Sequence, residues 1–360
     1  MKQHLITLTS ALLLSAAAYA QPSAWVNCGA AGGSAVTRTW DGGGADENWS
    51  TAANWNPDGV PDCNDNAIFN NSSSKFCRIN SGVTVRDITL NSNYSGRLII
   101  ESNGSIASED ITVNGSLLVA NSNSGMLRAN TLTVSNNGYA GLNRAEFSGA
   151  FTIGAAGYAA FNSYGSLDAG SIVLGNHASF TAPSDYRLNP DAKVIVRGAF
   201  TKDKVSSFHH NQGLVEFITT SSIDINLSSA TGQNNGRTVF HNLVMNATGA
   251  SDNFQIASSD SIVVANRLTI TDGEFRGGGG SAGWVIIEDT LQYNGIGDAG
   301  STATFLVRGA KTCDLFLSAE DLVGGASTLH ISNNAVIRKG SASSINSRFV
   351  WNLMDGANVS

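Results

Sequence analysis

Short apolar triplets recur along the chain, and in each the outer two residues are apolar while the middle one is often threonine. This period of two is typical of β-strands, because successive side chains of a strand point to opposite faces. The first residues of seven triplets are separated by 23, 21, 19, 21, 22 and 21 positions. The seven are Ile88-Thr89-Leu90, Ile111-Thr112-Val113, Leu132-Thr133-Val134, Phe151-Thr152-Ile153, Ile172-Val173-Leu174, Val194-Ile195-Val196 and Val215-Glu216-Phe217.

Other apolar positions accompany these triplets within each unit. One of them, such as Ile106 or Leu127, precedes its triplet by five positions. A third cluster follows the triplets and consists of Leu117, Val119, Tyr139, Tyr158, Ala160, Phe180 and Phe200. Three short strands in about 21 residues suit one coil of a β-helix, whose coils stack at the strand spacing. After a longer gap the pattern resumes at Leu243, Ile262, Val285, Phe305 and Leu329.

We therefore predict an all-β fold, a right-handed parallel β-helix with coils of about 21 residues. The competing architecture is a pair of tandem β-sandwiches, which also use short strands but need no constant repeat. The pattern places solenoid coils at residues 83–225, a protruding loop at 226–237 and further coils at 238–360. It leaves open whether the coils are truncated at the C-terminus.

Residues 21–82 differ in composition and are expected to form an N-terminal capping region. A first coil without a cap would expose its apolar end and its unpaired backbone edge to water. Four aromatic residues gather here, namely Trp40, Trp49, Trp55 and Phe69. We expect them to be buried in the cap, because tryptophan is usually largely buried; the alternative is a platform for sugar stacking.

Residues 1–20 have the features of a secretory signal peptide. Lys2 precedes an apolar run from Leu5 to Tyr19, and Ala18-Tyr19-Ala20 has the small residues of a cleavage site. The run is short for a membrane-spanning helix, which needs about 20 apolar residues. We therefore expect a secreted or cell-surface protein without a transmembrane segment in the mature chain.

Charge and composition do not change the predicted fold, but they reduce the number of candidate classes of binding partner. Without Lys2 the chain has 20 basic and 28 acidic side chains, a net charge of −8. We therefore expect no nucleic-acid partner, since binding nucleic acid requires a basic face that neutralises phosphates. The remaining candidate partners are host or environmental glycans and other surface proteins.

The chain has four cysteines, Cys28, Cys63, Cys77 and Cys313. An oxidising compartment permits disulfides, and a local bridge between Cys63 and Cys77 is the predicted one, with Cys28 as an equally available partner. The sequence lacks a Cys-x-x-Cys motif and clustered histidines, so we expect no zinc site and no cofactor. His209 and His210 are adjacent, and neighbours in a strand point to opposite faces.

The N-terminal region contains Asp41, Asp46, Asp62 and Asp65, whose oxygen atoms suit calcium. Their spacing matches neither an EF-hand nor a Gly-Gly-x-Gly-x-Asp repeat. We expect these side chains to cap turns of the backbone instead.

Enzymes built on β-helices need clustered acids or an acid–base pair. Arg128 and Asp168 occupy equivalent places two coils apart, whereas Glu146 is predicted to belong to a different row. We therefore predict no catalytic residues and a protein that is not an enzyme. A polysaccharide-degrading enzyme is the third choice of function.

Four threonines occupy the middle of successive triplets and would form a row on one face: Thr89, Thr112, Thr133 and Thr152. Such a row is suited to binding carbohydrate or ice, although β-propensity alone also favours threonine there. An adhesive or structural role for a stiff solenoid is the first hypothesis, and binding of carbohydrate or ice is the second.

The N-terminal aromatic residues belong to a longer string. It runs Trp40-Asp41-Gly42-Gly43, Asn48-Trp49, Asn54-Trp55, Val60-Pro61 and Asp65-Asn66-Ala67-Ile68-Phe69. The string covers about 30 residues and resembles the start of passenger-type β-helices of bacterial autotransporters and related large secreted surface proteins. The resemblance implies an exported solenoid displayed at the cell surface. The sequence departs from that family because it shows no translocator barrel, sortase-type motif or terminal apolar anchor.

Overall fold

The structure is a computed structural model of the chain. It describes residue 28 and residues 35–120, 125–183, 192–203, 205–220, 223–227, 237–247, 253–256 and 260–272, followed by short strands between residues 274 and 359. The predicted signal peptide and most of the predicted protruding loop, residues 228–236, lie outside the described residues.

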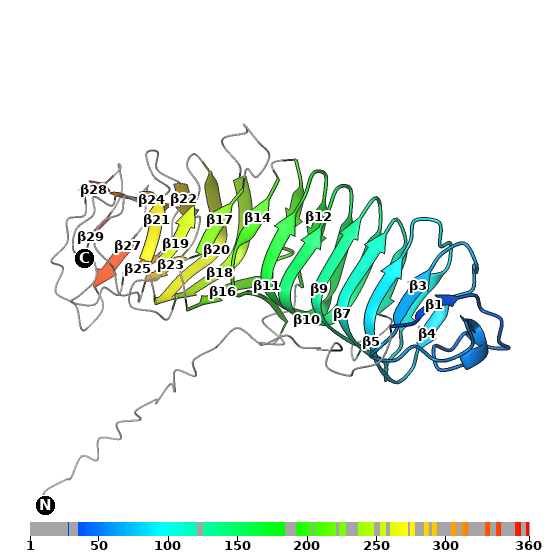
Figure 1. The fold of residues 1–360 in the computed structure, drawn as a ribbon. Coiled ribbons are helices and arrows are strands. Elements are labelled where there is room, and N and C mark those ends of the chain that lie inside the picture. The colour runs from blue at the N-terminus through cyan, green and yellow to red at the C-terminus, as the bar shows by residue number, and fades with distance from the viewer. Residues whose placement is uncertain are drawn as a thin grey trace, which may run out of the picture.

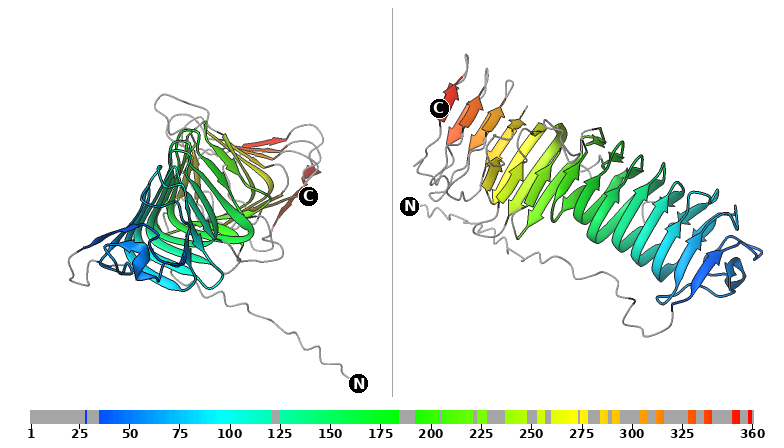
Figure 2. Two further views of the ribbon diagram at one scale, coloured as in Figure 1. Left: turned by 90° about the vertical axis from the view of Figure 1, so that its right-hand side faces the viewer. Right: turned by 45° about the horizontal axis from the view of Figure 1, so that its top comes forward.

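The described strands stack into an elongated parallel β-solenoid (Figure 1). Aligned residues of neighbouring coils, such as Ile88 and Ile111, or Ile111 and Leu132, are 23 and 21 positions apart. An end-on view shows the strands surrounding a central core on three sides (Figure 2). The predicted parallel β-helix is thus confirmed, and its parallel pairing excludes tandem β-sandwiches.

One side of the solenoid, the threonine face, is formed by the final parts of the long strands and by short strands paired with them. Its strands are β3 (Asn66–Phe69), β14 (Phe200–Lys202), β17 (Ile223–Asn226), β19 (Asn253–Ile256), β21 (Glu274–Gly277) and the ends of β5 (Gly82–Leu90), β7 (Ser105–Asn114), β9 (Met126–Ser135), β10 (Tyr139–Ile153) and β11 (Tyr158–Leu174).

The second side, the charged face, uses the first parts of β5, β7 and β9 and the middle of β10 and β11. It continues through β13 (Lys193–Val196), β16 (Leu214–Thr219), the ends of β18 (Arg237–Ala247) and β20 (Ser261–Asp272), and then β23 (Thr290–Tyr293), β25 (Thr312–Leu315), β27 (Val336–Lys339) and β29 (Asn358–Val359).

The third side, the tyrosine face, begins with β4 (Cys77–Ile79), β6 (Arg97–Ile100) and β8 (Leu117–Ala120). It continues through the starts of β10 and β11, β12 (Ser179–Thr181), β15 (Ser207–His209), the starts of β18 and β20, β22 (Trp284–Ile287), β24 (Thr304–Val307), β26 (Thr328–Ile331) and β28 (Val350–Leu353).

Alternating side chains of every face point into one continuous core. Ile88, Ile111 and Leu132, three inward residues of the threonine face, are at most 1% exposed. Phenylalanines from different faces meet along the axis, with ring centroids 5.6 Å apart between Phe151 of the threonine face and Phe180 of the tyrosine face. Burying each such large apolar side chain stabilises a fold by roughly 1.5–3 kcal/mol, so the stack of coils itself supplies the driving force.

A cap closes the N-terminal end of this core. It comprises β1 (Thr37–Trp40), a short 3₁₀ helix η2 (Ala52–Asn54) and β2 (Trp55–Asn56), and β2 pairs with β1 in antiparallel fashion. Trp40, Trp49, Trp55 and Phe69 are all at most 1% exposed and pack edge-on or tilted against one another. The predicted tryptophan-rich cap is therefore present, and burial removes these rings from any sugar platform.

The ladders begin before residue 83, the first residue predicted for the coils. β3 and β4 lie within the predicted capping region, yet they already pair in parallel with β5 and β6. At the predicted protruding loop, Asn226 ends β17 and Arg237 begins β18.

The regular spacing of the triplets suggests that all of them belong to one face of the solenoid. In the structure they belong to two different faces. Val194 and Val215 belong to the charged face, where Val194 aligns with Leu167 rather than with Ile172. Ile172 aligns with Phe200 instead. The cause is physical: all three faces show the same apolar alternation, so the pattern does not distinguish them.

Candidate functional site

Ion pairs join neighbouring coils on the charged face. Arg197 donates to both carboxylate oxygens of Asp168 at 2.7 and 2.6 Å. Lys193 donates to Glu216 at 2.6 Å, and Arg128 donates to Glu146 at 2.9 Å. These contacts hold acidic groups against basic groups of the adjacent strand, which is a stabilising arrangement when the geometry is bidentate.

Glu146 occupies the same outward row as Arg128 and Asp168, and its predicted place on a different row is wrong. Its backbone aligns with Arg128 on one side and Asp168 on the other. A register shift between Phe147 and the next aligned residue of β10 lengthens one coil relative to the next, and this hid the alignment in the sequence. The row does bring two carboxylates together on adjacent strands, but each has its own guanidinium partner.

The acidic residues near the cap bind the backbone and their neighbours. Asp46 accepts hydrogen bonds from the backbone of Asn48 and from the side chains of Thr51 and Asn54, and these bonds lower the pKa of its carboxyl group. Asp65 accepts from Arg38 at 2.6 Å. Among the described residues, no three His, Cys, Asp or Glu side chains are grouped as a metal site would need.

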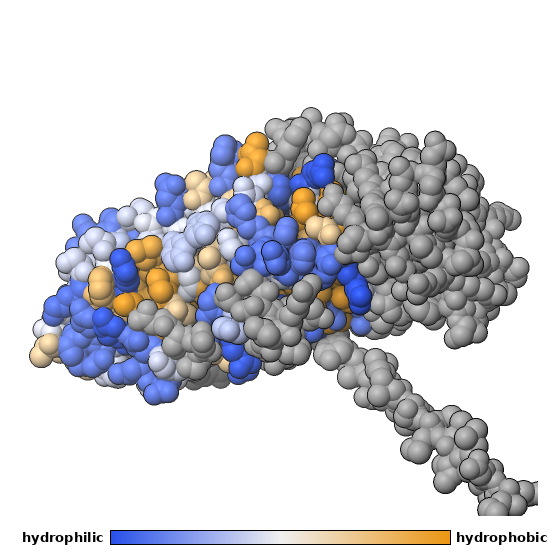
Figure 3. All heavy atoms as spheres, turned by 180° about the vertical axis from the view of Figure 1, so that it is seen from behind, coloured by the Kyte–Doolittle hydropathy of each residue, from blue (hydrophilic) through white to orange (hydrophobic). Residues whose placement is uncertain are grey.

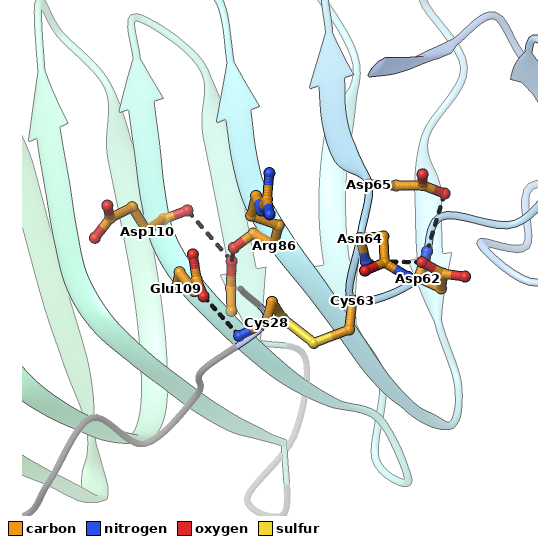
Figure 4. Close-up of a disulfide and its surroundings, with 9 residues drawn as sticks. Cys28, Asp62, Cys63, Asn64, Asp65, Arg86, Glu109 and Asp110 are labelled. Atoms are coloured by element: carbon orange, nitrogen blue, oxygen red, sulfur yellow. Dashed lines mark hydrogen bonds between the residues drawn. A yellow bond between two sulfur atoms is a disulfide. The ribbon is translucent and has the colours of Figure 1, made fainter. Parts of the chain in front are cut away.

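A disulfide joins Cys28 to Cys63, with the two Cα atoms 5.1 Å apart (Figure 4). The predicted bridge between Cys63 and Cys77 is therefore wrong. Cys77 is an inward residue of β4, fully buried in the core, and burial raises the pKa of its thiol. The backbone N–H of Cys28 donates to Glu109 at 2.6 Å, so the bridge also lies against β7.

His209 and His210 do not act as a pair. His210 instead stacks on His241 of β18, with ring centroids 5.6 Å apart and 12° between the planes. Burial, and then the neighbouring His241 and His209, lower the pKa of His210. This contact is formed across coils, so the order of residues in the sequence did not reveal it.

The predicted threonine row exists and lies on the outer surface. Thr89, Thr112, Thr133 and Thr152 align strand by strand, and all four are half-buried. The row continues through Val173 to Thr201, a member that the sequence did not reveal because its coil is longer. The adjacent outward row of this face starts with Asn66, Asp87 and Asp110.

The tyrosine face carries outward apolar residues that the sequence pattern had grouped with the core. Leu117, Tyr139 and Tyr158 align on consecutive strands and point outward, whereas their neighbours Leu118, Ala140 and Ala159 are buried. Figure 3 shows hydrophobic residues gathered among hydrophilic ones on the side of the solenoid behind the view of Figure 1. The sequence did contain a signal for them: in these strands consecutive residues are apolar, so apolar side chains must point outward as well as inward.

Comparison with known proteins identifies one similarity. Residues 39–163 match a family model described as a domain of unknown function, DUF8693. This stretch holds the cap and the coils through the start of β11. Neither the curated proteins nor the solved structures gave a match. None of the described residues forms a helix long and apolar enough to cross a membrane.

Proposed function

We propose that this chain is a non-enzymatic, exported β-solenoid with an adhesive or structural role at the cell surface. The observation that carries the proposal is the use of charged groups on the charged face. Asp168, Glu146 and Glu216 are each held by a basic side chain of an adjacent coil. These ion pairs stabilise the stack of coils. A solenoid of this kind presents long flat surfaces to its surroundings.

Three features support export. Residues 1–20 have the pattern of a signal peptide. The bridge between Cys28 and Cys63 suits an oxidising compartment. The resemblance of the cap region to autotransporter passengers favours the same destination.

The test is to express the full chain in a bacterial host and to separate cytoplasm, periplasm, membrane and medium. We expect the chain outside the cytoplasm, shortened by 20 residues and with Cys28 and Cys63 oxidised, as intact mass and peptide mapping would show. A matched chain lacking residues 2–20 should remain in the cytoplasm. Cytoplasmic retention of the full chain would contradict export.

The non-enzymatic part is tested separately on the purified protein. Incubation with neutral and acidic polysaccharides should release no reducing ends and no unsaturated uronides. Release that disappears in a variant carrying both Asp168→Asn and Glu146→Gln would instead assign an acid–base pair to the charged face.

Ice binding by the threonine face is the second candidate function. It is favoured by four consecutive threonines, Thr89 to Thr152, whose hydroxyl groups lie at the strand spacing, and by Thr201, which resumes the row beyond Val173. Ice-recrystallisation assays should then show inhibition that is lost in a Thr112→Lys, Thr133→Lys double variant. Equal growth of ice crystals with and without the protein would exclude it.

A further inference from the structure

A row of large side chains crosses the outer surface of the tyrosine face. Arg97, Leu117, Tyr139 and Tyr158 align on the consecutive strands β6, β8, β10 and β11. Arg97 also lies over the ring of Phe76, 5.5 Å from its centroid. The row stops abruptly, because the next aligned residues are Ser179 and Ser207.

The two tyrosine rings stand on the sheet as a stacked pair. Their centroids are 5.2 Å apart, with 16° between the planes, close to the spacing of the strands that carry them. Tyr139 leans over its own strand, and a Cβ atom on Gly141 would come within 2.9 Å of its ring. Gly141 therefore allows the ring to take this position, and burial raises the pKa of the Tyr139 hydroxyl.

Stacking covers one face of the Tyr158 ring and leaves the other open. Tyr158 is 37% exposed, and the residue beside it in the next strand is the small Ser179. Thr181 of the same strand aligns with Ala160. The surface therefore drops from the Tyr158 ring to the smaller side chains of the next strand, and we call this place the step. The Tyr158 ring borders the step on one side, and the hydroxyl groups of Ser179 and Thr181 lie at its base.

The described outward residues around the step carry no formal charge. The outward residues of four consecutive strands are Tyr139, Gly141, Tyr158, Ala160, Ser179, Thr181, Ser207 and His209. The charged face of the same coils carries Glu146, Asp168 and Lys193. A ligand that fits the step thus has an apolar face, hydroxyl groups and no charge.

We propose that the open face of the Tyr158 ring is a stacking subsite for a sugar unit of a neutral polysaccharide. The C–H-rich face of a pyranose packs on an aromatic ring, and its hydroxyls can pair with Ser179 and Thr181. The proposal rests on the proposed adhesive function and names the class of ligand for it.

A protein partner fits this surface less well. A specific interface buries about 800 Å² on each partner and has an apolar centre. Among the residues whose side-chain exposure the structure describes, five large apolar side chains are at least 36% exposed, and they are Val36, Val60, Tyr158, Tyr164 and Val205. Val36 and Val60 belong to the cap region, Tyr164 lies further along β11 than Tyr158, and Val205 lies between β14 and β15. A single ring with hydroxyls beside it matches one sugar unit better than it matches a protein interface.

The test is affinity electrophoresis of the exported chain, residues 21–360, in native gels that contain hydroxyethylcellulose, galactomannan or polygalacturonate. We expect retardation by at least one neutral polymer and none by the acidic one. Tyr158→Ala should weaken the apparent affinity by about tenfold, the loss of one aromatic stacking contact. Tyr158→Phe keeps the ring and should retain binding.

Two further variants separate the subsite from a general loss of structure. Ser179→Leu should also weaken binding, because its side chain would cover the open ring face while Tyr158 stays in place. Tyr164→Ala removes an exposed tyrosine elsewhere in β11 and should bind as the wild type does. Circular dichroism and melting of each variant would show whether the fold is retained.

Retardation by neither neutral polymer, or equal binding by Tyr158→Ala, would overturn the subsite. Retardation by polygalacturonate alone would also overturn it and direct attention to basic side chains such as Arg97. None of these results bears on export or on the absence of catalysis, which the fractionation and product assays decide.

Discussion

His210 illustrates how a single side chain responds to its neighbours in adjacent coils. Its ring lies against that of His241, and its pKa is lowered by burial and by the two other histidines nearby. As the pH falls below the unfolded value of about 6.5, the unfolded chain binds a proton more readily than the folded chain. Stability contributed by neutral His210 is therefore present above this pH and is lost below it.

We expect urea unfolding at pH 5.5 to show a lower free energy of unfolding than at pH 7.5. His210→Asn should reduce this difference between the two pH values. The control is His177→Asn, an exposed turn residue, which should keep the wild-type pH dependence. Equal pH dependence in both variants would show that His210 is not the group responsible.

At the scale of the element, the turns between the threonine and tyrosine faces use the left-handed region of backbone conformation. Asn136, Asn137, Ala156 and His177 all have positive φ there, with values of 51° to 64°. Asparagine tolerates this conformation, whereas alanine has a steric penalty. Ala156, with φ of 53°, is thus the least suited residue in the set.

Ala156→Asn is expected to raise the free energy of unfolding by about 0.5–1 kcal/mol, because it relieves this penalty. Ala155→Asn is the matched control, since residue 155 is also exposed but has no positive φ. Thermal and denaturant unfolding would measure both variants. Equal stability of the two would show that the turn carries no such penalty.

The ion pairs of the charged face differ in exposure and should differ in strength. The side chains of Arg197 and Asp168 are 10% and 22% exposed, whereas that of Arg128 is 46% exposed. Asp168→Asn should cost about 2 kcal/mol, because it leaves a largely buried guanidinium without its bidentate partner. Glu146→Gln, at the aligned position of the adjacent strand, should cost less than about 1 kcal/mol.

Denaturant unfolding of these two variants at low and high salt would test the comparison. We expect the Glu146→Gln effect to shrink with salt, since exposed charges are screened. The Asp168→Asn effect should largely persist. A larger effect for Glu146→Gln would contradict the ranking by exposure.

The sequence predicted which residues of a strand point into the core better than it predicted the face of the solenoid to which the strand belongs. Apolar alternation identified the inward residues of the threonine face as far as Ile172, because each triplet there recurs after 19 to 23 positions. From Val194 onward, the triplets that the pattern identified belong to the charged face. Residues 184–191 lengthen that coil, and nothing in an apolar-polar pattern specifies which of three equivalent faces a triplet joins.

The candidate surfaces were predicted to different degrees for a related reason. The threonine row was found because its outward residues differ in type from their inward neighbours. Tyr139 and Tyr158 were not recognised as surface residues, because apolar residues stand on both sides of those strands. The bridge from Cys28 was missed as the first choice, since its partner is 35 positions away and local spacing favoured Cys77.

For the whole molecule, the N-terminal cap determines how the core ends. Trp55 is fully buried between Trp40, Trp49 and Phe69, and its indole N–H donates to the backbone of Trp49 at 2.8 Å. Trp55→Ala should destabilise the protein by about 3–5 kcal/mol, through lost burial and the cavity left behind.

Val60→Ala is the control for this substitution, because Val60 is 39% exposed in the same region. Denaturant unfolding should show little change for Val60→Ala. Hydrogen exchange would then show whether the loss in Trp55→Ala begins in the first coils and spreads along the stack, as nearest-neighbour coupling in a solenoid implies. Unchanged stability of Trp55→Ala would mean that the cap is not needed to close the core.

The unequal length of the coils has a consequence for how such a chain can change by insertion and deletion. Ile172 and Phe200 align although 28 positions separate them, whereas Leu132 and Phe151 align across 19. The extra residues of the longer coil include 184–191, between β12 and β13, and the ladders on either side keep their pairing. Segments can therefore be added at a corner without shifting any face, while one residue added inside a strand would turn every following side chain of that strand to the opposite side.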